Sequence, residues 1–224
     1  MSIAKNLEDI KATFFDSECL LVAVSKTKPI EDLREAYEAG VRDFGENKVQ
    51  EIQAKQPDMP DDTRWHMIGH LQRNKVKYIA PFVHLIHSVD SFKLLKEIDK
   101  QGKKVDRQIS VLLQIHIAEE ESKFGFDQAE LNEMLASADF RELSHVNVIG
   151  LMGMATFTEN EGQIRKEFKG LKQLFEKLKS ENLPEFVKMK ELSMGMSSDY
   201  LIAQQEGSTM VRIGSSIFGA RNYN

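Results

Sequence analysis

Short apolar runs alternate with amphipathic stretches from one end of the chain to the other. An apolar run bounded by turn residues is typical of a buried strand, whereas apolar residues at three- and four-residue spacing are typical of a helix facing a core. The runs that predict strands are Leu20 to Lys26, Asp43 to Asn47, Trp65 to Gly69, Leu85 to Asp90, Ile109 to Ile117, Val146 to Met152, Glu191 to Met194 and Met210 to Gly214.

Each connection between these strands contains a plausible helix. Pro29 to Ala39 begins with proline and is followed by Gly40, which is the arrangement favoured at helix starts and ends. Apolar residues from Ile164 to Leu178 form a single stripe. Ahead of the first strand, Ser2 to about Phe14 predicts an additional helix with Ser2 as its N-cap.

The strands at 20–26 and 109–117 are apolar on both faces, which suits parallel strands covered by helices on one side and by a barrel interior on the other. Eight strand and helix units predict an α/β fold, a single TIM (β/α)8 barrel over residues 1–224 with an extra N-terminal helix. An open doubly wound sheet is the alternative, although it commonly carries fewer strands in a domain of this size.

Composition narrows the classes of protein. With 41% hydrophobic and 29% charged residues among 224, the chain is neither disordered nor fibrous. The longest stretch without Asp, Glu, Lys or Arg, Leu143 to Thr158, falls short of the ~20 apolar residues that span a bilayer. Glu8 and Asp9 stand where a secretory signal has its apolar core, so we expect a cytoplasmic protein. The lone Cys19 excludes an internal disulfide.

The net charge is −5, and the chain has no long block of like charge. We therefore do not expect it to bind nucleic acid. A whole-chain charge still leaves room for a local basic pocket that binds a small anion.

Functional groups of a parallel barrel sit where its strands end, at the carboxyl mouth. Lys26 ends the first strand on the same face as Val22 and Val24. Burial there would disfavour the ammonium form and favour an amine that forms a Schiff base with a carbonyl. The alternative is a lysine that reaches past the strand into solvent. Lys28, beside Pro29, is expected to be a solvated loop residue.

The last strand carries Arg212 and then opens through Gly214, Ser215 and Ser216. Glycine allows a close approach of the backbone to a ligand, and N–H groups at a helix start can hold a phosphate. The loops after strands seven and eight are also the usual phosphate site of such barrels.

The end of strand seven is a second small turn, from Ser193 to Ser198. By itself this turn could equally be an anion site or an N-cap, with Ser197 or Ser198 capping a helix from Asp199 to Gln205. Two such turns side by side favour an anion site.

Other polar residues carry weaker signals. Asn47 ends strand two, where it faces the mouth as a neutral hydrogen-bonding group or serves as an N-cap. His66 and His70 are four residues apart, but they flank a strand end and no carboxylate completes a ligand set, so we expect no metal site. P-loop, dinucleotide-binding and nucleophile-elbow patterns do not occur in the sequence.

A Schiff-base lysine and a phosphate turn at one mouth suit a ligand with an aldehyde and a phosphate on one flat ring, and pyridoxal 5'-phosphate (PLP) is such a ligand. Ordered motifs point the same way: VSKTKP from Val24, FGEN from Phe44, WHMIG from Trp65, LQRNK from Leu71, SMGMS from Ser193, VRIG from Val211 and IFGAR from Ile217. Together they resemble the pyridoxal phosphate homeostasis proteins, the YggS/PROSC type, over nearly the whole chain.

The resemblance implies a barrel like the N-terminal domain of alanine racemase, with PLP bound through Lys26 and Arg212 near its pyridine nitrogen. It implies phosphate contacts from the strand-seven turn and from the start of the last helix. The residues expected to bind the cofactor are Lys26, Asn47, Ser193, Ser197, Arg212, Gly214 and Ser215.

The family's role is to buffer PLP or deliver it to PLP-dependent apoenzymes, and we expect a monomer without robust catalysis. The alternative is a PLP-dependent racemase or lyase, and a Schiff-base aldolase also fits the lysine and phosphate signals.

Alanine racemase has a second domain that supplies a catalytic tyrosine, whereas strand eight here lies close to Asn224. An arginine that donates to the pyridine nitrogen would also leave that nitrogen unprotonated, which weakens the ring as an electron sink for catalysis. His66 and Tyr200 are the candidates for a second acid or base.

Overall fold

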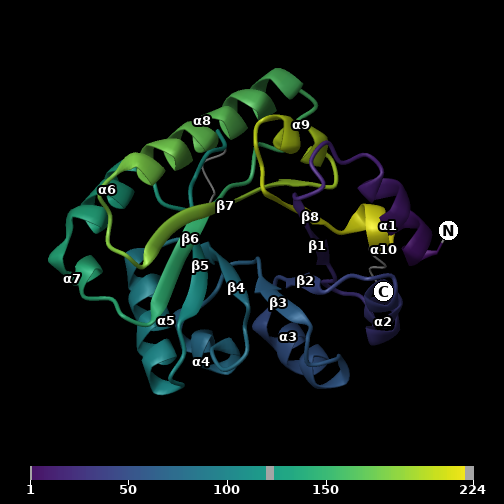
Figure 1. Ribbon diagram of the computed structural model, residues 1–224, viewed down its shortest axis with the longest axis horizontal. Helices are drawn as coiled ribbons and strands as arrows, with labels where there is room; N and C mark the ends of the chain where they lie inside the picture. Colours follow the sequence, from purple (N-terminus) through teal and green to yellow (C-terminus); the bar gives the residue numbers. More distant parts are fainter. Residues whose placement is uncertain (1, 120–123, 220–224) are drawn as a thin grey trace.

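The computed structural model describes residues 2–119 and 124–219, and within them eight parallel strands form a closed barrel in sequence order (Figure 1). The predicted TIM barrel is therefore confirmed, and the open sheet is excluded. The strands are β1 (Leu20–Val24), β2 (Asp43–Glu46), β3 (Arg64–Met67), β4 (Leu85–Val89), β5 (Ile109–Gln114), β6 (Val146–Met152), β7 (Val187–Met196) and β8 (Met210–Ile213).

Helices surround the barrel, and every connection between consecutive strands contains at least one (Figure 1). The α-helices are α1 (Ile3–Lys11), α2 (Ile30–Glu38), α3 (Val49–Lys55), α4 (Val76–Ile79), α5 (Phe92–Lys104), α6 (Gln128–Ala136), α7 (Ala138–Arg141), α8 (Glu161–Ser180), α9 (Tyr200–Gln205) and α10 (Ser215–Phe218). Two 3₁₀ turns, η1 (Gln56–Asp58) and η2 (Arg73–Lys75), precede β3 and α4.

The additional helix α1 is confirmed, and the Ser2 hydroxyl caps it by accepting from the Lys5 N–H. It ends earlier than predicted because the Thr13 hydroxyl donates to the Ile10 carbonyl and the chain turns before Phe14. Asn6 donates to the Ile217 carbonyl at 2.8 Å, which ties α1 to α10.

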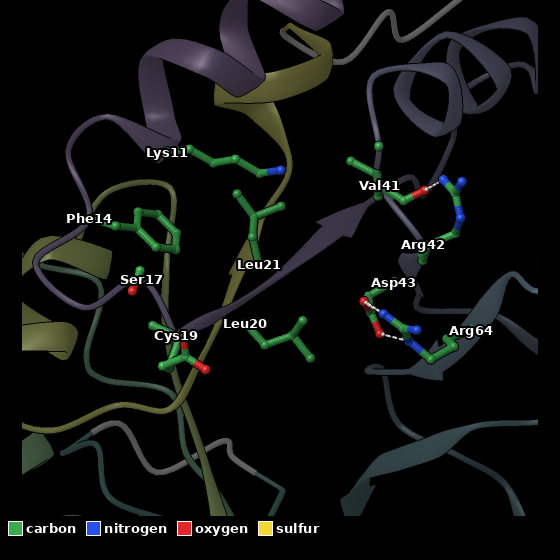
Figure 2. Close-up of a pocket in the computed structure, with 12 residues that line it drawn as sticks. Lys11, Phe14, Ser17, Cys19, Leu20, Leu21, Val41, Arg42, Asp43 and Arg64 are labelled. Atoms are coloured by element: carbon green, nitrogen blue, oxygen red, sulfur yellow. Dashed lines mark hydrogen bonds and ion pairs between the residues drawn. The ribbon is translucent and has the colours of Figure 1, made fainter.

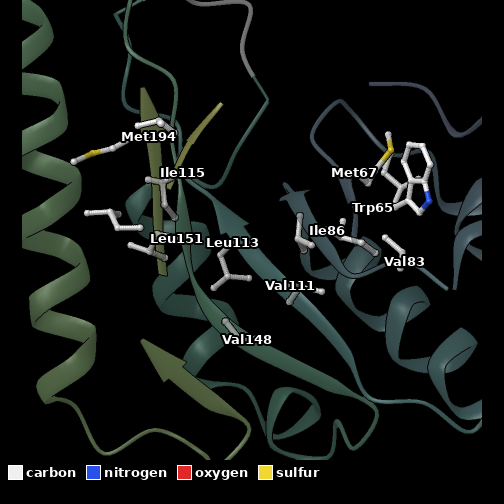
Figure 3. Packing of buried hydrophobic residues seen from close by; sticks show 14 of the residues in the cluster. Trp65, Met67, Val83, Ile86, Val111, Leu113, Ile115, Val148, Leu151 and Met194 are labelled. Carbon is white, nitrogen blue, oxygen red and sulfur yellow. The ribbon is translucent and has the colours of Figure 1, made fainter. Parts of the chain in front are cut away.

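The strands are apolar on both faces because each face meets a different core. Figure 3 shows the outer core, in which Leu113, Leu151 and Met194 pack between strands and helices. The interior of the barrel holds a smaller apolar cluster, made of Val22, Leu85, Leu112, Met152 and Met210. A polar side chain on the inner face of a strand is therefore buried inside the barrel unless it lies near an end.

Several predicted boundaries shift. β1 ends at Val24, so Lys26 lies just beyond the strand, and β7 begins earlier than the predicted Glu191. Cys19 is buried at the amino end of the barrel (Figure 2), where burial raises the pKa of its thiol to about 12. Ala220 and Arg221 of the last motif lie outside the described residues. Among the helices of the described segments, none has the length and apolarity to cross a membrane.

Candidate functional site

The carboxyl ends of the strands surround a pocket of about 540 Å³, called the mouth pocket here. That volume lies within the ~300 to 1,000 Å³ of ordinary small-molecule sites. Six of the seven predicted site residues line it: Lys26, Asn47, Ser197, Arg212, Gly214 and Ser215. They come from β1, β2, β7 and β8 and their following loops, so the fold brings together residues that are far apart in the sequence.

Lys26 lies on a segment held by buried polar contacts. The Ser25 hydroxyl donates to Glu46 Oε1 at 2.7 Å, and Lys55 Nζ donates to the same oxygen at 2.7 Å and to the Ser25 carbonyl at 2.9 Å. Thr27 has a φ of +64°, which costs energy for a β-branched residue, and its N–H donates to Glu51 Oε2 at 2.7 Å. These contacts fix the backbone on both sides of Lys26.

Glu46 is fully buried beneath this segment. Its burial raises the pKa of the carboxyl to about 7, against the opposing effects of Lys55 and Ser25. Its Oε2 atom is buried without a hydrogen-bond partner in the described part of the chain. A buried oxygen without a partner makes the ionised carboxylate less stable, which agrees with the raised pKa.

Asn47 lines the mouth pocket and also carries an unsatisfied polar atom. Its Oδ1 is buried and has no hydrogen-bond partner among residues 2–119 and 124–219. Gly69 packs against it so closely that a Cβ there would lie 2.7 Å from Asn47 Cβ. A buried amide oxygen without a partner is costly, and this atom could reach a ligand only if the side chain moved.

The two turns predicted to bind an anion do meet. The Gly214 N–H donates to Ser197 Oγ at 3.2 Å, and Ser215 begins α10 beside them. Between Ser193 and Ser197, Gly195 has a φ of +94°, and a Cβ there would lie 2.5 Å from Ala203 Cβ. Glycine is needed at this point for the turn to form.

Two further features of these turns concern the cap of α9 and the packing of β1. Neither Ser197 nor Ser198 caps α9, because Asp199 stands at the N-cap and its Oδ1 accepts from the Met196 N–H at 2.5 Å. The absence of a side chain at Gly214 also makes room for β1, since a Cβ would lie 3.1 Å from the Val24 carbonyl oxygen.

Arg212 lies at the base of the mouth pocket and is 4% exposed. Burial lowers the pKa of its guanidinium to about 10, which still leaves it charged at neutral pH. NH1 donates to Ser193 Oγ at 2.5 Å and NH2 donates to the Gly153 carbonyl at 3.1 Å. Ser193, the seventh predicted site residue, is fully buried and contacts Arg212 and His87 instead of facing the pocket.

Three weaker candidates lie elsewhere than expected. His66 is fully buried inside the barrel, and the Tyr200 hydroxyl is 2.8 Å from Thr13 Oγ1 near α1. Neither position suits an acid or base acting at the mouth. Lys28 is half-buried and donates to the Phe218 carbonyl at 2.7 Å, so it is not the solvated loop residue that the sequence predicted.

His70 and Phe124 line the mouth pocket and were missed. Their rings stack with centroids 4.1 Å apart, and His70 Nδ1 lies 2.8 Å from Asp90 Oδ2. His70 lies three residues beyond the end of β3, and its place near a strand end was the signal that could have found it.

A carboxylate does accompany His66, contrary to the expectation that none completes a ligand set. Potential ligand atoms of Asp43, His66 and His84 lie within 4.8 Å of one another. Arg64 donates to both oxygens of Asp43, as the dashed lines in Figure 2 show, and both ring nitrogens of His66 have hydrogen-bond partners. Hydrogen bonds thus join Asp43 to Arg64 and His66, and the ring of His84 packs against that of His66 with centroids 5.3 Å apart.

Comparisons with known proteins agree with this geometry. The model of the alanine racemase N-terminal domain family matches residues 1–222. The pyridoxal phosphate homeostasis protein of Aquifex aeolicus is 41% identical over 204 residues, which is 91% of this chain and 87% of that protein. The same-named protein of Pasteurella multocida is 41% identical over 215 residues, covering 93% and 89%. The chain belongs to the pyridoxal phosphate homeostasis protein family.

Solved structures extend the family likeness to the fold. PipY of Synechococcus elongatus, solved with PLP bound, has a TM-score of 0.87 and 35% identity, covering 97% of this chain and 100% of PipY. Alanine racemase from Bartonella henselae has a TM-score of 0.75 at 14% identity, covering 97% of this chain and 58% of the racemase. The second likeness concerns the fold alone.

Proposed function

We propose that this protein binds PLP in the mouth pocket, with Lys26 as the residue that bonds to it covalently. The observation that carries the proposal is that Lys26, Arg212 and the turn of Ser197 with Gly214 line one pocket. The Lys26 amine would add to the aldehyde carbon of PLP and release water, which forms a Schiff base. PipY, solved with PLP bound, supports the choice of ligand.

The remaining predicted residues take roles that suit their positions. Ser197, Gly214 and Ser215 hold the phosphate, because hydroxyl and backbone N–H groups gather at that turn. Arg212 donates to the pyridine nitrogen. Asn47, which lines the pocket, meets a polar substituent of the ring.

Ser193 acts through Arg212 instead of binding phosphate, because the partners of its hydroxyl are Arg212 and His87. A buried serine on a guanidinium helps to hold the cation in place without touching the ligand itself.

The protein keeps PLP sequestered and passes it to PLP-dependent apoenzymes without turning over amino acids at a useful rate. Relatives at 41% identity are named homeostasis proteins, which supports this role. Racemisation needs an acid and a base on opposite sides of the substrate, and the positions of His66 and Tyr200 do not suit that task. We extend the proposal, on the sequence grounds given above, to a monomer that acts in the cytoplasm.

An amino-acid racemase or lyase is the second candidate. The alanine racemase fold favours it, and so does His70, which lies in the mouth pocket with its Nδ1 held by Asp90. General acid–base help from such a residue typically contributes ~10² to 10⁴ in rate, so the two candidates differ by a measurable amount.

The test titrates purified protein with PLP and records visible absorbance, then incubates the loaded protein with L-alanine in deuterium oxide and follows the α-proton by NMR. We expect a visible band, no exchange at enzyme-like rates, and transfer of PLP to an added apoenzyme. A protein that stays colourless would refute PLP binding through a Schiff base. Rapid α-proton exchange that is lost in Lys26→Ala would establish the enzyme instead.

A further inference from the structure

Buried polar side chains form a continuous line through the barrel interior, which we call the interior chain. His66 Nε2 lies 2.9 Å from Asp43 Oδ1, and His66 Nδ1 lies 2.9 Å from His87 Nε2. His87 Nδ1 lies 3.0 Å from Ser193 Oγ, which accepts from Arg212 at 2.5 Å. None of the five residues is more than 4% exposed. Because water is largely excluded, the hydrogens on these groups must be arranged to suit one another.

The two ends of the interior chain have opposite hydrogen-bonding character. The Arg212 guanidinium can only donate, and an ionised Asp43 carboxylate can only accept. Although burial by itself raises the pKa of Asp43, hydrogen bonds from Arg64 and His66 outweigh it and lower the pKa to about 2. Asp43 is therefore ionised at neutral pH, and the direction of donation is set at both ends.

With both histidines neutral, one arrangement of hydrogens forms every bond. Since Ser193 Oγ accepts from Arg212, its own hydrogen donates to His87 Nδ1. His87 then carries its proton on Nε2 and donates to His66 Nδ1. His66 likewise carries its proton on Nε2 and donates to Asp43. The interior chain thus runs from the cation at the mouth to the carboxylate near the other end of the barrel.

An extra proton on His66 would disturb this arrangement. His66 would donate from both nitrogens, which forces the His87 proton onto Nδ1 and leaves the Ser193 hydrogen without an acceptor in the interior chain. The positive charge on His66 would also compete with Arg64 for the Asp43 carboxylate. Arg64 already donates to both oxygens of that carboxylate. The arrangement with one hydrogen on Nε2 of each ring therefore leaves fewer buried groups without a partner.

We propose that the other four members of the interior chain are positioning residues, which hold the Arg212 guanidinium in one orientation at the base of the mouth pocket. Ser193 engages NH1 and the Gly153 carbonyl engages NH2, so the planar group cannot rotate without breaking a buried hydrogen bond. The inference deepens the proposed function and rests on it at one point, namely that Arg212 faces the ring nitrogen of PLP.

The first experiment needs no PLP and therefore stands apart from the proposed function. Long-range ¹H–¹⁵N NMR of the unloaded wild-type protein distinguishes histidine tautomers, and the chain has six histidines. His66→Gln and His87→Gln variants assign the two signals. We expect both rings to be neutral with the proton on Nε2. A doubly protonated His66 with His87 protonated on Nδ1 would overturn the inferred direction.

The second experiment measures binding of two ligands, PLP and its analogue with CH in place of the ring nitrogen. Ser193→Ala should weaken PLP binding about tenfold and binding of the analogue less than about twofold, because Arg212 acts on the nitrogen alone. Ser88→Ala is the matched control, since Ser88 is equally buried and its hydroxyl has no hydrogen-bond partner in the described segments. An equal loss for both ligands, or none for either, would contradict the positioning role. Failure of the wild-type protein to bind PLP would refute the proposed function instead, while the NMR result would still decide the direction of the interior chain.

Discussion

The mouth pocket and the interior chain are both polar, yet they differ in how far their groups are satisfied. In the interior chain, one arrangement of hydrogens gives every side chain a partner. In the mouth pocket, Asn47 Oδ1 is buried without a partner in the described part of the chain. A satisfied buried network holds its members in place, whereas an unsatisfied buried atom costs energy and leaves its side chain free to rearrange. The difference separates residues that orient from residues that bind.

Replacing Lys26 should have the largest effect on the mouth pocket. Lys26→Ala removes the amine that bonds to PLP, so we expect the visible band to disappear and PLP affinity to fall about 100-fold, equivalent to about 2.7 kcal/mol. Residual binding through the phosphate turn should remain. Lys28→Ala is the control, because Lys28 donates to the Phe218 carbonyl, and it should keep the band. Loss of the band in both variants would contradict the assignment to Lys26.

Breaking the interior chain at its far end should affect stability. We expect Asp43→Asn to lower the free energy of unfolding by about 2 kcal/mol at pH 7, because the pKa of Asp43 lies at about 2 in the fold, below its ordinary value. A lowered carboxyl pKa stabilises the fold above the ordinary value, near pH 4, and this stabilisation is lost as the pH falls toward 2.

Denaturant unfolding at several pH values measures this effect. The gap between wild type and Asp43→Asn should therefore narrow below about pH 4. Asp62→Asn is the control, since Asp62 pairs with Arg42 on the surface, and exposed pairs contribute ~0 to 1 kcal/mol. A gap that stays constant down to pH 2 would show that the Asp43 charge is not the source of the stability.

Removing the Ser197 hydroxyl should have a smaller effect, confined to the phosphate end of the mouth pocket. Ser197→Ala should weaken PLP binding about tenfold and leave binding of pyridoxal, which lacks the phosphate, within about twofold. Fluorescence titration with both ligands checks this. Ser216→Ala is the control, because it removes a hydroxyl from the neighbouring helix α10, and it should change neither affinity. Equal weakening toward both ligands would place the phosphate elsewhere.

The smallest effect is expected at the rim of the mouth pocket. His70 stacks on Phe124, and 41% of its side chain is exposed. His70→Ala should speed release of PLP about threefold, because it removes one wall of the pocket but no group assigned to the cofactor. Stopped-flow transfer to an apoenzyme measures the rate. A loss of the visible band in this variant would mean that His70 takes part in the covalent step.

The residues of the mouth pocket could largely be predicted from the sequence, because strand periodicity shows which side chains share a face. Alternation placed Lys26 on the face of Val22 and Val24. Val22 does lie in the barrel interior, and Val24 and Lys26 line the mouth pocket. Six predicted residues line one pocket because the carboxyl ends of parallel strands meet at one end of a barrel.

The interior chain could not be predicted in the same way. Asp43, His66 and His87 come from three different strands, and the register between strands decides whether their side chains meet. Ser193 looked like a phosphate ligand because its turn is rich in hydroxyls, but the long strand β7 buries it beside Arg212. The start of α9 was equally hard to assign, since Asp199 stands at its N-cap without a side-chain capping bond and instead accepts from the Met196 N–H.

The most direct test of the central claim is chemical. Borohydride reduction of the PLP-loaded protein converts a Schiff base into a stable amine, and peptide mapping by mass spectrometry then locates the modified lysine. We expect the modification on Lys26, whose neighbours Ser25 and Thr27 are fixed by hydrogen bonds to Glu46 and Glu51. Modification mainly on Lys28, or scattered over surface lysines, would contradict the account.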